Sequence, residues 1–89
     1  MKNKLTVILP LKERPEFTKI WLENNYNEYY EYIIADGSHS EKNKEIFLNF
    51  KKKNIKYLRF KPDTNYRDYY KKMYDCSLLV KTDFVIQSD

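Results

Sequence analysis

Glycine, cysteine and histidine are nearly absent from this chain of 89 residues, which contains one of each. A phosphate-binding P-loop and a three-glycine dinucleotide fingerprint both need several residues without a Cβ atom, so the single Gly37 excludes both. Cys76 alone cannot form an internal disulfide, and with His39 alone a zinc site built mainly from cysteine and histidine is excluded. No apolar run approaches the length of a membrane span, and the first residues lead into a predicted strand rather than a signal peptide.

Aromatic and basic residues, by contrast, are abundant. Aromatic residues make up 17% of the chain, with nine tyrosines, which argues against disorder. Seventeen lysines and arginines against thirteen acidic residues give a net charge of +4, with a cluster at Lys51, Lys52 and Lys53. This positive balance favours polyanionic ligands. The alternative is that the lysine cluster is the solvated end of a helix, where positive charge complements the helix dipole. We expect one small, soluble, cytoplasmic domain over residues 1–89, with one modest core.

Short apolar runs alternate with helical patterns along the chain. Strands are predicted at 5–9 (ending at Pro10), 32–35, 55–60 and 82–87, with the third nearest a sheet edge. Helices are predicted from Pro15, from a capping box at 38–41 with lysines 51–53 in the last turn, and from Tyr66. The third helix has a tyrosine-rich face that we expect to pack in the core: Tyr66, Tyr69, Tyr70, Met73, Tyr74 and Ser77. Because helical crossovers join parallel strands, the predicted fold is α/β, a doubly wound, parallel, four-stranded sheet of Rossmann-like order βαβαβαβ.

Polar residues follow three of the predicted strands, at the sheet edge where such folds bind ligands. They are Lys12, Glu13 and Arg14 after the first strand, Asp36, Gly37 and Ser38 after the second, and Asp89 after the fourth. Lys12 or Arg14 could contact phosphates, Asp36 could accept from a base N–H or a ribose hydroxyl, and Asp89 could hold a divalent cation. The alternative is structural, because Asp-Gly-Ser is also a frequent turn in which glycine takes a positive φ.

Three segments carry a resemblance to a known family. TVILPLKERPEF, followed by YEYIIADGS, resembles the opening of an inverting family-2 glycosyltransferase with the A-type (GT-A) nucleotide-diphosphosugar fold. The ending KTDFVIQSD resembles the strand that delivers the Asp-x-Asp metal motif of that fold. In the A-type fold the fourth strand packs beside the first, which implies a strand order of 3-2-1-4.

The resemblance implies roles for individual residues. Asp36 matches the second Asp of the family's Asp-Asp-Gly-Ser, which binds the base, commonly uracil, while Ala35 replaces the first. Asp89 matches the first metal-binding Asp, so Mn²⁺ or Mg²⁺ is expected in the full-length protein. The nucleotide-binding residues expected on these grounds are Pro10, Leu11, Glu13, Arg14, Asp36 and Gly37.

The expected function is therefore that of a glycosyltransferase-like domain, which binds a UDP-sugar for transfer to an unknown acceptor. The family's second metal-binding Asp would fall beyond Asp89, so we expect a fragment that holds the donor-binding half, has no catalytic residue of its own and is inactive alone. We also expect self-association through an exposed edge of the fourth strand. The alternatives are a purely structural α/β domain or a nucleic-acid-binding module that uses lysines and arginines of residues 51–61, with Tyr57 and Phe60 as stacking partners.

Overall fold

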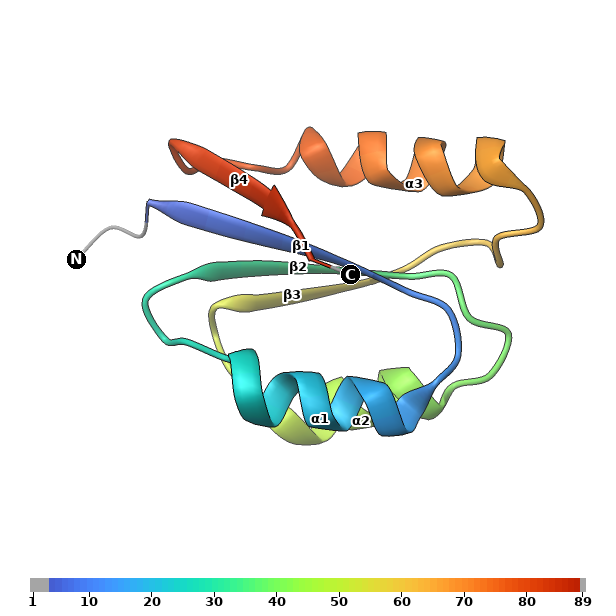
Figure 1. The fold of residues 1–89 in the computed structure, drawn as a ribbon, viewed down its shortest axis with the longest axis horizontal. Coiled ribbons are helices and arrows are strands. Elements are labelled where there is room, and N and C mark those ends of the chain that lie inside the picture. The colour runs from blue at the N-terminus through green and yellow to red at the C-terminus, as the bar shows by residue number, and fades with distance from the viewer. Residues whose placement is uncertain (1–3, 89) are drawn as a thin grey trace.

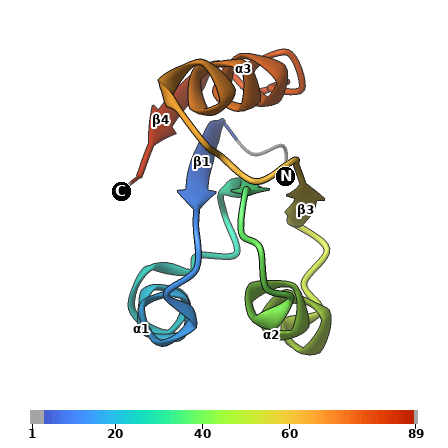
Figure 2. The same ribbon diagram turned by 90° about the vertical axis from the view of Figure 1, so that its right-hand side faces the viewer.

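The computed structural model describes residues 4–88, which form a sheet with helices on both faces (Figures 1 and 2). The elements, in chain order, are β1 (Leu5–Leu11), α1 (Pro15–Asn25), β2 (Glu31–Asp36), α2 (Lys42–Phe50), β3 (Ile55–Arg59), α3 (Tyr66–Ser77) and β4 (Phe84–Gln87). All strand pairs are parallel, in the order β3-β2-β1-β4. Helices α1 and α2 lie on one face and α3 on the other. The predicted fold class and strand order are confirmed.

Strand β1 runs two residues beyond its predicted end and includes Pro10. The carbonyl of Ile8 accepts from the N–H of Ser88, on the β4 side, whereas the carbonyl of Leu11 accepts from Gly37, on the β2 side. Backbone groups alternate along a strand, so the nitrogen of Pro10 faces the β4 side, past the last described pairing of Ile8 with Gln87. The missing N–H therefore costs no described ladder hydrogen bond, and proline is tolerated in the strand.

The core has two parts because β1 and β2 are apolar on both faces and are covered on both. The larger part, under α1 and α2, is formed by Val7, Leu9, Leu11, Trp21, Leu22, Tyr32, Ile34 and Phe47. The smaller part, under α3, is formed by Ile8, Ile33, Ala35 and Cys76. Strand β3 is only partly buried at one edge of the sheet, as its mixed sequence predicts.

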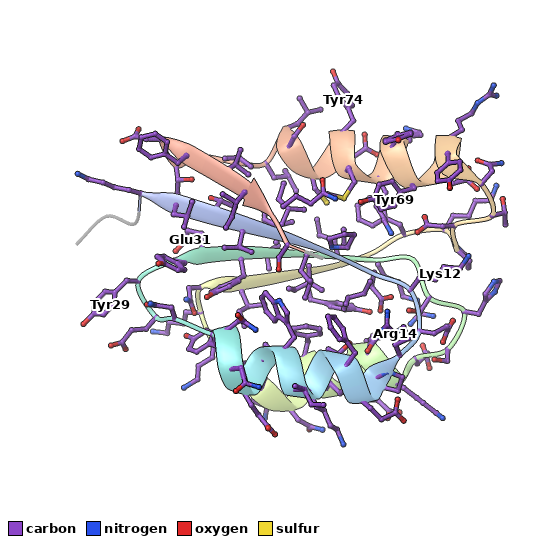
Figure 3. The ribbon with its side chains drawn as sticks, viewed as in Figure 1. Lys12, Arg14, Tyr29, Glu31, Tyr69 and Tyr74 are labelled. Carbon is purple, nitrogen blue, oxygen red and sulfur yellow. The ribbon has the colours of Figure 1, made fainter. Side chains whose placement is uncertain are left out.

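Helix α3 begins at its predicted start, but only part of its predicted core face meets the sheet: Met73 packs against the smaller part of the core. Tyr66, Tyr70 and Tyr74, expected in the core, are 81%, 65% and 64% exposed. The buried residues of the helix are instead Lys72 and Cys76. Figure 3 shows Tyr74 pointing away from the sheet. Lysine is a rare core residue, and Lys72 is tolerated there because it meets a carboxylate of the preceding loop, described below.

The predicted ends of α2 are also wrong. The residue that precedes its first turn is Glu41, with no side-chain cap, because Ser38 is buried and bonded to another loop. At the other end Lys51 adopts a left-handed conformation, with φ 50° and ψ 58°. The three lysines therefore follow the helix rather than forming its last turn.

Candidate functional site

A cavity of about 710 Å³ opens at the carboxyl end of β1, between the start of α1 and the start of α3. Its walls are residues 10–14 of the strand end and loop, Phe17 of α1, residues 63–66, and Tyr69 and Lys72 of α3. The chain passes from β1 to β2 and β3 on one side and returns to β4 on the other, so strand order reverses at β1. The cavity thus occupies the position where open α/β sheets bind ligands, and its volume suits a small molecule.

Four of the predicted nucleotide-binding residues line this cavity: Pro10, Leu11, Glu13 and Arg14. Asp36 and Gly37 lie on the neighbouring strand end and are not part of its lining. Asp89, the predicted metal ligand, lies outside the described residues. Ser88, the residue before it, accepts a hydrogen bond of 3.0 Å from the indole N–H of Trp21 in α1. Part of the predicted site thus lies together in one cavity, and its role in nucleotide binding stays a prediction.

Two exposed cationic side chains lie at the cavity. Lys12 and Arg14 both project from the β1–α1 loop at the same end of the sheet (Figure 3). The Lys12 Nζ atom donates to the backbone carbonyl of Asp63 at 2.5 Å. The Arg14 guanidinium lies 4.9 Å from the centre of the Phe17 ring, a cation–π arrangement. The cavity therefore combines positive charge with aromatic walls.

Glu13 joins two loops rather than presenting a free carboxylate. Its Oε2 atom accepts from the backbone N–H of His39 at 2.5 Å, and its Oε1 atom accepts from the Ser40 hydroxyl at 2.7 Å. The hydroxyl of Ser40, followed by the N–H of His39, lowers the pKa of Glu13 below its usual value. The backbone N–H of Glu13 donates to the Ser38 hydroxyl at 2.6 Å, and its carbonyl accepts from the side-chain amide of Asn43.

The backbone of this loop is strained at the same place. Glu13 and Arg14 have φ values of 56° and 58°, in the left-handed region that disfavours side chains with a Cβ atom. Two consecutive residues in this region persist only where surrounding contacts fix them, and the hydrogen bonds of Glu13 do so. The strain lies beside the cavity and aims the Arg14 side chain.

The role of Glu13 predicts a pH-dependent loss of stability in the variant Glu13→Gln. The native pKa is lowered, so the carboxylate stabilises the fold fully above its unfolded pKa and loses this effect as pH falls through the native value. We expect E13Q to lower the melting temperature at about pH 7 and to show a smaller difference at about pH 3. Thermal unfolding followed by circular dichroism measures this, with the exposed Glu23→Gln as control. Equal differences for E13Q at both pH values would disprove this role of the Glu13 carboxylate.

Asp36 is fully buried, and both of its carboxylate oxygens are bonded inside the protein. One oxygen accepts from the Ser38 backbone N–H at 2.9 Å, and the other accepts from the hydroxyl of Tyr57. Burial, and then the bond to Asp36, raise the pKa of Tyr57 well above its usual value, so the phenol stays a donor. These hydrogen bonds agree with the structural alternative, in which Asp36 belongs to a turn after the strand rather than to a ligand site.

Gly37 is required by close approach rather than by backbone conformation. Its φ is not positive, contrary to the prediction for this turn. A Cβ atom at Gly37 would lie 2.7 Å from Oδ2 of Asp63, closer than real Cβ contacts allow. The N–H of Asp63 also donates to the carbonyl of Gly37 at 3.3 Å. The loop after β3 is thus packed tightly against the end of β2.

Asp63 and Lys72 form a buried ion pair in the cavity wall, and sequence reasoning missed both. Lys72 Nζ lies 2.5 Å from Oδ2 of Asp63, and their side chains are 2% and 10% exposed. The other oxygen, Oδ1, is buried and has no hydrogen-bond partner among the described residues. Asp63 follows β3 at the same sheet edge as Asp36 follows β2. A search for polar residues after every strand, including the third, would therefore have identified it.

Comparisons with known proteins do not assign this chain to a family. No protein-family model matches the sequence, and no curated protein matches it significantly. Within residues 4–88, no group of three or more His, Cys, Asp or Glu side chains is placed to hold a metal ion. None of the helices in that range is long and apolar enough to cross a bilayer.

Proposed function

We propose that this chain binds the nucleoside-diphosphate part of a sugar donor, as a glycosyltransferase-like domain of the GT-A type. The observation that carries the proposal is the cavity at the strand-order reversal, which has Lys12 and Arg14 at its mouth and aromatic side chains in its walls. Ammonium and guanidinium groups form the stronger, charge-assisted hydrogen bonds with phosphate oxygens. Phe17, Tyr66 and Tyr69 offer aromatic surface against which a base can stack.

The remaining parts of the proposal rest on the sequence resemblance. A divalent ion, Mg²⁺ or Mn²⁺, would be held through Asp89 and would neutralise the diphosphate. Transfer of the sugar to an acceptor belongs to the proposed family, and we assign no catalytic residue for it. A cytoplasmic location is part of the proposal, and a lone, buried cysteine suits a reducing compartment.

The nucleic-acid-binding alternative has weaker geometric support. The ring of Tyr57 stacks on Phe47, with centroids 5.5 Å apart, and its hydroxyl is bonded to Asp36. Phe60 packs against the core under α3. Both rings proposed as base-stacking partners are therefore engaged within the protein.

Calorimetric titration with UDP, and separately with uridine, tests the proposed function. We expect UDP to bind at least about tenfold more tightly than uridine, because one charge-assisted hydrogen bond contributes about 1.5–3 kcal/mol. We expect a weak complex, with a Kd above 1 µM, in the range typical of a site with few polar contacts. Equal affinities, or no binding of UDP at millimolar concentration, would contradict a diphosphate site.

Self-association through β4 is the partner proposal. This strand is at the edge of the described sheet, and Phe84, Val85 and Ile86 are about half exposed or more. Exposed apolar edge strands pair with other chains, so we expect the light-scattering mass to rise with protein concentration. A charged substitution on this strand, Val85→Lys, should keep the protein monomeric. A wild-type mass that stays monomeric at millimolar concentration would contradict this proposal.

A further inference from the structure

We propose that Asp63, rather than Asp36, contacts the base of the bound nucleotide and selects a base that presents a ring N–H, such as uracil. This inference rests on the proposed function. It differs from what the sequence resemblance implies, since that assigns the base to Asp36. It names the base that the cavity prefers.

The first observation is the unpartnered oxygen of Asp63. The residue is 8% exposed and lines the cavity, and its Oδ1 atom is buried without a hydrogen-bond partner among the described residues. Buried polar atoms are nearly always bonded, so an unpaired one in a native fold calls for an explanation. A ligand that donates an N–H at the cavity wall would supply the missing bond.

The second observation is that the rest of Asp63 is held in place. Lys72 donates to Oδ2 in an ion pair of 2.5 Å, and the oxygens of a carboxylate only accept hydrogen bonds. Lys12 donates to the backbone carbonyl of Asp63, and the N–H of Asp63 donates to Gly37. The three partners lie in α3 and in the loops after β1 and β2, so Asp63 is held from three sides, as a specificity determinant requires.

Asp36 lacks both features. It is fully buried, and its two oxygens accept from Ser38 and from Tyr57. A base could reach it only after these bonds were broken, and the residue is not part of the cavity wall. Asp36 therefore stabilises the turn after β2, and the Oδ1 atom of Asp63 is the acceptor that is left without a partner in the cavity wall.

The chemistry of the bases gives the preference. Uracil has a donor N–H at ring position 3, whereas cytosine has an acceptor nitrogen at that position. A carboxylate oxygen accepts from the first and repels the second. A site built to hydrogen-bond one group discriminates strongly against an analogue that lacks it. We expect wild-type protein to bind UDP at least about tenfold more tightly than CDP.

The variant Asp63→Asn tests this preference. Lys72 only donates, so it should retain the amide oxygen and leave the amide NH₂ in the place of Oδ1. The substitution then replaces an acceptor by a donor, and the ratio of UDP to CDP affinity should fall by about tenfold or more. The matched control is Asp36→Asn, which should leave the ratio unchanged. We compare ratios because partial unfolding of a variant lowers its apparent affinity for both nucleotides by the same factor.

If Asp63→Asn does not fold, the double variant Asp63→Leu/Lys72→Met removes both charges with side chains of similar size. In that variant the UDP to CDP ratio should fall to about 1. A wild-type ratio retained by the folded D63N or double variant, or a loss of preference in D36N alone, would overturn the assignment to Asp63 while nucleotide binding stands. Failure of folded wild-type protein to bind either nucleotide would overturn the proposed function, and this inference with it.

Discussion

Replacement of Lys72 by methionine is expected to lower the free energy of unfolding by about 3–5 kcal/mol. The side chain is 2% exposed, and its removal leaves the Asp63 carboxylate buried without a counter-charge. An uncompensated buried charge costs far more than the pair contributes relative to apolar residues. A domain of this size has a total stability of about 5–10 kcal/mol, so K72M should lose a large part of it. Urea denaturation at neutral pH, followed by circular dichroism, measures the loss.

Two further variants separate this effect from a general loss of lysine. Lys71, the preceding residue, forms an exposed pair with Asp75 at 3.6 Å. Surface pairs contribute at most about 1 kcal/mol, so Lys71→Met should be nearly neutral. The double variant D63L/K72M should recover most of the stability lost in K72M. A K72M variant no less stable than K71M would show that the pair is not buried.

Removal of both exposed cations at the cavity should weaken UDP binding about a hundredfold. Lys12 and Arg14 are each placed to form a charge-assisted hydrogen bond with phosphate, at about 1.5 kcal/mol or more per bond. The double variant K12M/R14M loses both, whereas its affinity for uridine should fall much less, because uridine has no phosphate and is affected only through the bond of Lys12 to Asp63. Calorimetric titration at constant ionic strength measures the two affinities.

The matched control is K53M/K56M, which removes the same two charges. These lysines line a smaller cavity at the opposite end of the sheet. If the effect were one of net charge, both double variants would weaken UDP binding equally. Equal losses would therefore contradict a local anion site at the end of β1, and a larger loss in K53M/K56M would place that site at the opposite end of the sheet.

The fold was predictable because its signals are local. Apolar runs buried on both faces give β1 and β2, and helical spacing between the strands makes the sheet parallel. The orientation of α3 was not predictable from these signals. Its tyrosines repeat at helical spacing and suggest a core face, whereas the residues buried against the sheet include a lysine, Lys72. Helical periodicity identifies an aromatic face but not the carboxylate, Asp63, that allows Lys72 to be buried.

The candidate site was predictable in part, for a related reason. The loop after β1 was identified because charged residues follow a strand end, and four predicted residues line the cavity. The role of Asp36 depends on Tyr57 of the neighbouring strand, because the Tyr57 hydroxyl donates a hydrogen bond to the Asp36 carboxylate. Such pairing across strands follows from the register of Ile34 with Tyr57 and Asp36 with Arg59, which sequence alone does not give.

The most direct test of the account is the location of bound UDP, measured by amide chemical-shift changes in ¹⁵N-labelled protein. The proposed site predicts that the largest changes fall in residues 11–14, 63–66 and 69–72, around the cavity at the end of β1. Changes concentrated in residues 51–61, or at the opposite end of the sheet, would contradict it.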